Sequence, residues 1–134
     1  MKRHEVIDHT ADVGLRAYGS TAPEIFESAA EGMFSLVTRS PVAEKGEIEL
    51  HLEAHSRERL LVDWLSELLF LFETRGLLFH SFEVKLRGNK LDAKASGELY
   101  DPERHEKAMD IKAVTFHMLE LNEKKGYAQV LFDI

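Results

Sequence analysis

The chain has 134 residues, of which 44% are hydrophobic and 31% charged, with a formal net charge of −7. This length predicts one domain over residues 1–134 that buries a core without covalent cross-links, and the absence of cysteine excludes disulfides, thiolate zinc sites and cysteine nucleophiles. The acidic balance argues against broad, sequence-independent binding to nucleic acid, which requires clustered Lys and Arg.

No stretch of the chain has the apolar length of a signal peptide or of a membrane-spanning helix. We therefore expect a cytoplasmic location. The first residues run directly into a strand pattern, and strands are also expected at residues 13–19, 48–54, 78–87, 90–99, 112–121 and 127–133. In the 90–99 strand, Leu91 and Leu99 are expected to face the core, whereas residues 100–109 have little pattern and indicate a loop.

Two helices are expected, each with a recognisable start. Thr21 and Glu24 have the spacing of a capping box, which predicts a helix that extends to about residue 37. Ser56 is expected to cap a second helix, whose stop is Gly76. The middle of this second helix is apolar almost all round, which indicates deep burial or an interface.

The order of these elements is strand, helix, strand, helix, hairpin, hairpin. It predicts an α+β fold, a single-domain sandwich with two helices packed on a mixed, largely antiparallel β-sheet. A doubly wound parallel fold is not expected, because the second half of the chain lacks crossover helices.

Acidic residues stand near both ends of the chain. The first group is the segment DHTADVG at residues 8–14, and the second is Asp133 beside Ile134. An EF-hand that started at residue 8 would need Gly at position 13 and Glu at position 19, where this chain has Val and Gly. A turn stabilised by Asp side chains is the simpler local interpretation. If the fold brings the ends together, Asp12, Asp133 and the Ile134 terminus would form an all-oxygen cluster that favours a hard cation.

The strand expected at residues 112–121 carries two further polar side chains of interest. His117 could serve as an acid, a base or a metal ligand, although a partly buried histidine with a local partner is the more common case. Lys112 stands at the start of the strand and is most simply a solvated charge. The other histidines lack zinc-ligand spacing, and no phosphate-loop, dinucleotide or nucleophile-elbow motif is present.

Four cations gather around the hairpin expected at Gly88, namely Lys85, Arg87, Lys90 and Lys94. They could contact RNA phosphates or an acidic partner, but a solvated sheet edge explains them more simply.

Taken together, three stretches resemble the archease family. They are residues 8–14 with the strand and helix that follow up to Phe34, residues 111–117 (IKAVTFH) and residues 130–134 (VLFDI). The resemblance covers essentially the whole chain. It departs from the family at Phe116, where members often have Tyr, and at Asp8, where members carry Glu in some cases.

The resemblance implies a role as activator of the tRNA-splicing RNA ligase, which joins a 3′-phosphate or cyclic phosphate to a 5′-hydroxyl end. That ligase uses GTP and manganese and passes through a guanylated histidine. The family promotes ligase guanylation and multiple turnover without catalysing ligation, so we expect no enzymatic activity, no catalytic residue and RNA contact only through the ligase.

The resemblance also implies a calcium site. Its ligands would be Asp12, Asp133 and Ile134, the last through backbone or terminal oxygens, with other divalent cations as alternatives. Asp8, His9, Lys112 and His117 are expected to face the partner or to support these ligands.

Two other functions are compatible with the same residues. A small metal-dependent phosphoesterase would use Asp12 and Asp133 for the metal and His117 as the base. A chaperone-like interaction module would use the apolar second helix as its contact surface.

Overall fold

Seven strands form two sheets within residues 3–8 and 12–134, the part of the chain that this computed structural model describes. The strands are β1 (His4–Asp8), β2 (Asp12–Tyr18), β3 (Gly46–Glu53), β4 (Leu77–Arg87), β5 (Lys90–Leu99), β6 (Ala113–Asn122) and β7 (Tyr127–Asp133). One sheet has the order β1-β2-β7-β6 and the other β3-β5-β4. All neighbouring strands within them are antiparallel.

The two helices are α1 (Ala22–Val37) and α2 (Arg57–Arg75). Thr21 Oγ1 accepts a hydrogen bond from the Glu24 N–H, and the Glu24 carboxylate accepts one from the Ser20 N–H. These contacts confirm the predicted capping box. Ser56 caps α2, and Gly76 ends it in the left-handed conformation at φ 68°, both as predicted.

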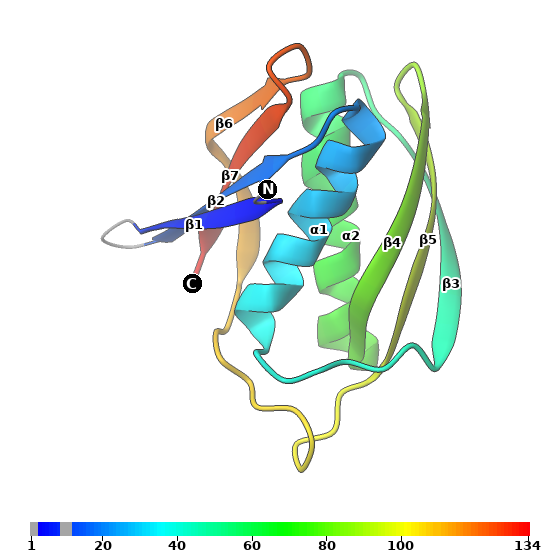
Figure 1. Ribbon diagram of the computed structural model, residues 1–134, viewed down its shortest axis with the longest axis vertical. Coiled ribbons are helices and arrows are strands. Elements are labelled where there is room, and N and C mark those ends of the chain that lie inside the picture. Colours follow the sequence, from blue (N-terminus) through cyan, green and yellow to red (C-terminus); the bar gives the residue numbers. More distant parts are fainter. Residues whose placement is uncertain (1–2, 9–11) are drawn as a thin grey trace.

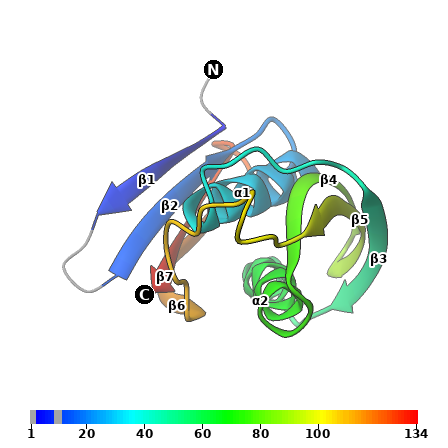
Figure 2. The same cartoon turned by 90° about the horizontal axis from the view of Figure 1, so that it is seen from below.

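Both helices lie between the two sheets, as Figures 1 and 2 show from two directions. The α+β class with two helices is therefore confirmed, but the strands form two antiparallel sheets instead of one mixed sheet. The physical reason lies in the helices. Apolar side chains surround much of the circumference of α2, and a single sheet packed against one side of the helices would leave part of these side chains in water. Trp64 of α2 is fully buried, and its Nε1–H donates to the Phe26 carbonyl of α1 at 3.0 Å.

The chain returns from the three-stranded sheet to the four-stranded sheet through residues 100–112, which pass below the helices in Figure 1. The buried carboxylate of Glu98 fixes this connection. It accepts two hydrogen bonds from Arg104, at 2.6 and 3.0 Å, and contacts Nε2 of the buried His105 at 3.0 Å. The Ala43 N–H donates to the same carboxylate at 2.7 Å. Three parts of the chain thus meet at one acidic group.

This arrangement corrects one expectation about β5. Leu99, predicted to face the core, is 64% exposed, whereas Glu98 is 5% exposed. The connecting segment folds over the side of the strand that would otherwise face water, so Glu98 becomes buried there with its partners. The hydrogen bonds from Arg104 and from the Ala43 N–H hold the pKa of the Glu98 carboxyl far below its usual range.

Among the described residues, neither helix combines the length and apolar character that crossing a lipid bilayer would require.

Candidate metal site

Asp12 and Asp133 occupy directly opposite positions on β2 and β7. Side chains at opposite positions of an antiparallel pair point to the same face, with Cβ atoms about 4.5–5.5 Å apart. The neighbours Val13 and Phe132 are buried on the inner face, at 5% and 0% exposure, so the two carboxylates lie on the outer face. Asp12 is half-buried and Asp133 is exposed.

The strand β6 adds a third position to this row. Ala113 stands opposite Asp133 on the side away from β2, and the Lys112 N–H donates to the Asp133 carbonyl at 2.7 Å. Ile111, just before them, is 2% exposed and anchors the start of the strand. The structure therefore brings Lys112 to the end of the sheet where the two carboxylates lie.

Ile134 follows Asp133 at the end of β7. The alternation of the strand predicts that its side chain faces the core with Val130 and Phe132, but Ile134 is 41% exposed, whereas they are 1% and 0% exposed. That prediction is wrong because the residue lies beyond the last pair of the sheet. Its main-chain oxygens are adjacent in sequence to the Asp133 carboxylate.

Two predicted site residues can be placed only in part. Asp8 pairs with Val13 in the register of β1 and β2, which puts its backbone at the same end of the sheet as Asp12. The side chain of Asp8 and the whole of His9 lie outside the described residues.

His117 is not beside the carboxylates. The pairing of β6 with β7 is interrupted between Thr115 and Glu120, and His117 falls within this irregular stretch. Glu120, further along the strand, pairs with Gln129, four positions from Asp133, so His117 lies between that pair and the row of the carboxylates. Met118, next to it, has a φ of 53°, an uncommon conformation for a large side chain, and His117 is exposed.

The donor chemistry of the Asp12–Asp133 pair suits a hard cation. Like charges at opposite positions on neighbouring strands are destabilising, and a bound cation removes that cost. Calcium takes six to eight oxygen ligands, whereas the two carboxylates and the main-chain oxygens of Ile134 supply only part of such a shell. Within residues 3–8 and 12–134, no group of three His, Asp or Glu side chains is placed to hold a metal. Any site here would have to be completed by main-chain oxygens, water or a partner.

Comparison with known proteins identifies the family. Residues 4–134 match the model of the Archease protein family (MTH1598/TM1083). The chain belongs to the archease family. It is 40% identical to a protein of Pyrococcus abyssi named archease, over the full length of both chains. It is 44% identical to the archease of Methanosarcina mazei, covering 99% of this chain and 97% of that one.

A solved structure extends the likeness to the fold. The solution structure of protein 1598 of Methanobacterium thermoautotrophicum is 40% identical in sequence, covers 100% of both chains and superposes with a TM-score of 0.84. The two chains therefore share one fold.

The sequence did not predict the residues that place Lys112 at the same end of the sheet as Asp12 and Asp133. Glu98, Arg104 and His105 secure the connection that leads into β6, and the Ala108 N–H donates to the Val37 carbonyl at 2.8 Å further along it. No local pattern marks these residues, because their partners lie in other elements. A buried acidic residue at the end of a strand that alternates apolar and polar residues becomes recognisable only once the fold is known.

Proposed function

We propose that this chain activates the tRNA-splicing RNA ligase by promoting its guanylation and multiple turnover, and that it does so with a calcium ion bound by Asp12, Asp133 and the main-chain or terminal oxygens of Ile134. Membership of the archease family supports the ligase as partner. The observation that carries the metal site is the direct pairing of Asp12 with Asp133.

The geometry suits a role on a partner. The two carboxylates and Ile134 lie at the end of a sheet, with Asp133 and Lys112 exposed. A cation held there would keep coordination sites for water or for oxygen atoms of a partner. Lys112 would add a positive charge at the same end of the sheet, suited to a phosphate or carboxylate of the ligase–nucleotide complex. The chain would contribute position and charge, and the ligase would carry out the chemistry.

The test is ligation of RNA with a 3′-phosphate and a 5′-hydroxyl end by the cognate ligase, with the ligase limiting. Added protein should increase the number of turnovers per ligase and the guanylated fraction of the ligase. Asp12→Asn and Asp133→Asn should each reduce this gain at least tenfold. Asp92→Asn is the matched control, since it makes the same substitution on the other sheet. Equal turnover with and without the wild-type protein would refute the proposal.

The phosphoesterase alternative needs a base near the metal. His117, the candidate for that role, lies in the irregular stretch of β6 between Thr115 and Glu120, outside the row that contains the carboxylates. Hydrolysis of phosphate esters by the pure protein with calcium, magnesium or manganese would restore this alternative.

The chaperone-like alternative relied on the apolar second helix. Apolar side chains of this helix lie between the two sheets and are fully buried; they are Leu61, Trp64, Leu65 and Leu68. Those side chains therefore contribute to the core and are not available as a contact surface.

A further inference from the structure

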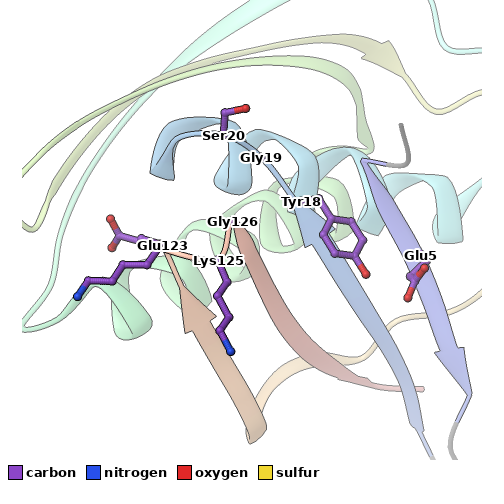
Figure 3. A pocket seen from close by; sticks show the side chains of 8 residues that line it. Glu5, Tyr18, Gly19, Ser20, Glu123, Lys125 and Gly126 are labelled. Carbon is purple, nitrogen blue, oxygen red and sulfur yellow. The ribbon is translucent and has the colours of Figure 1, made fainter.

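A shallow cavity of about 570 Å³, wide open to solvent, lies at the opposite end of the four-stranded sheet from the Asp12–Asp133 pair. Tyr18 ends β2, and the turn between β6 and β7 provides Lys124, Lys125 and Gly126 to its wall. Figure 3 shows Glu5 from β1, Tyr18 from β2 and Lys125 from the turn around this space. Its volume falls in the range of small-molecule sites, about 300–1,000 Å³.

A close backbone contact holds the two sides of this cavity together. The Gly19 N–H donates to the Gly126 carbonyl at 3.0 Å. Gly126 has a φ of +76°, and a Cβ atom there would stand 2.7 Å from the Gly19 carbonyl oxygen. Only glycine allows this approach without displacement of the backbone. The turn that carries the lysines is thereby fixed beside Tyr18.

Tyr18 is one of two neighbouring tyrosines on the outer face of the sheet. It stands directly opposite Tyr127 on β7, and both rings are half-buried. The Arg16 guanidinium lies 5.9 Å from the centroid of the Tyr127 ring, and its Nε donates to Gln129 at 3.0 Å. Burial raises the pKa of the Tyr18 hydroxyl, and its hydrogen bond with Glu5 raises that pKa further. The hydroxyl therefore stays protonated, and the hydrogen bond orients the ring.

Positive charge lies at the rim of the same cavity. Lys124 and Lys125 are exposed, and neither forms an ion pair with the rest of the described chain. Glu123 beside them is 3.3 Å from Arg57, which offsets its charge. The N–H groups of Ser20 and Glu24 at the start of α1 are already used in capping, whereas the two ammonium groups can donate hydrogen bonds to an anion.

We propose that this cavity binds a nucleotide, with the base stacked on Tyr18 and the phosphate held by Lys124 and Lys125. Aromatic faces with adjacent cations are the usual means by which proteins hold single-stranded nucleotides. Apart from Tyr18, the lining consists of Glu, Lys, Ser and Gly, and protein–protein interfaces are depleted in Glu, Lys and Ser relative to the rest of the surface. This site goes beyond the proposed metal site, because Tyr18 and Asp12 lie at opposite ends of β2, and it departs from the expectation that RNA is reached only through the ligase.

The nucleotide could be free or part of a single-stranded RNA, and both sources are tested together. Backbone amide NMR shifts of the whole chain are followed at low salt during two separate titrations. One uses AMP, and the other uses a 5′-phosphorylated RNA oligomer of five adenosine nucleotides. The expected result is saturable shifts at Gly19, Ser20 and the 124–126 turn. Saturation by AMP as tight as by the oligomer identifies a free nucleotide, and tighter binding of the oligomer identifies RNA. Absence of saturable shifts in both titrations would overturn the proposal.

Variants separate stacking from charge. Tyr18→Leu should weaken binding about fivefold to a hundredfold, whereas Tyr18→Phe should retain most of it because the ring remains. The double variant Lys124→Gln, Lys125→Gln should weaken binding and flatten its salt dependence. The matched control is Lys85→Gln with Lys94→Gln, two exposed lysines on the other sheet. Equal affinities of the control and the 124/125 variant would overturn the proposal, whether or not Tyr18→Leu folds.

Discussion

Asp12 and Asp133, which stand near opposite ends of the chain, face each other directly across β2 and β7. The two strands are neighbours over their whole length, from this pair to the Tyr18–Tyr127 pair at the other end. The relationship makes the end of the four-stranded sheet a place of concentrated negative charge, on which the proposed calcium site depends.

A cation introduced by mutation should compete with calcium for the proposed site. Ala113 is exposed and stands opposite Asp133 on the side away from Asp12. Ala113→Lys adds an ammonium group to the row without removal of a ligand, and its interaction with the carboxylates should weaken calcium binding about fivefold. Calorimetric titration measures the change, with Ala113→Gln as the uncharged control. If the lysine and glutamine variants bind calcium equally well, the two carboxylates do not hold the ion.

The turn beside Tyr18 should tolerate no side chain at Gly126. Gly126→Ala combines a positive φ with a close contact to the Gly19 carbonyl. Gly88→Ala shares the positive φ, at 57°, but its Cβ would have no atom within 4 Å. We expect a loss of about 1 kcal/mol in the free energy of unfolding for Gly88→Ala and about 2–3 kcal/mol for Gly126→Ala, by urea denaturation. Equal losses would mean that the backbone contact is not rigid.

The Glu98 cluster should make stability depend on pH in the acid range. Hydrogen bonds from Arg104 and Ala43 lower the pKa of Glu98 in the folded protein from its ordinary value of 4.5. The stabilisation is therefore complete above that value and is lost as the pH falls toward the folded-state pKa. Urea midpoints of the wild type and of Glu98→Gln should differ by a constant amount above about pH 5.5, and the difference should narrow steadily as the pH is lowered from 4.5 to 3. A difference that stays constant with pH would assign the effect to packing instead of charge.

Trp64 should matter through both its volume and its hydrogen bond. The side chain is fully buried between the sheets, and its Nε1–H donates to the Phe26 carbonyl. Trp64→Phe removes the donor and leaves unfilled space, for an expected loss of about 2–3 kcal/mol in the free energy of unfolding. Phe70→Leu, at a side chain that is 55% exposed, should change it by less than about 0.5 kcal/mol. A small effect at Trp64 would show that the contact between the helices is dispensable.

The parts of this fold that depend on local interactions could be predicted from the sequence. Thr21 with Glu24, Ser56 and Gly76 act within one turn of their own helices, and all are found as predicted. The division of the strands into two sheets could not be predicted in this way. It follows from the need to cover the helices on two sides, which is a property of the assembled core.

The candidate site also depends on long-range pairings that the sequence does not reveal. Alternation predicts that Asp133 points away from Phe132, which the exposures confirm. Nothing in the segments themselves pairs Asp133 with Asp12, and only the family resemblance suggested it. In β6 the alternation fails, since the irregular pairing and the positive φ of Met118 leave Phe116 53% exposed. The expectation that His117 supports the metal ligands came from the family resemblance, whereas the register places it in this irregular stretch.

Calcium titration of four proteins tests the central claim most directly: wild type, Asp12→Asn, Asp133→Asn and the matched control Asp92→Asn. The wild type and Asp92→Asn should each bind one calcium ion with the same affinity. Asp12→Asn and Asp133→Asn should each bind it at least tenfold more weakly. In the absence of calcium, the unfolding midpoints of both variants should remain close to that of the wild type. A wild type that binds no calcium, or variants at residues 12 and 133 that bind it as tightly as the control, would contradict the assignment of the Asp12–Asp133 pair as the metal site.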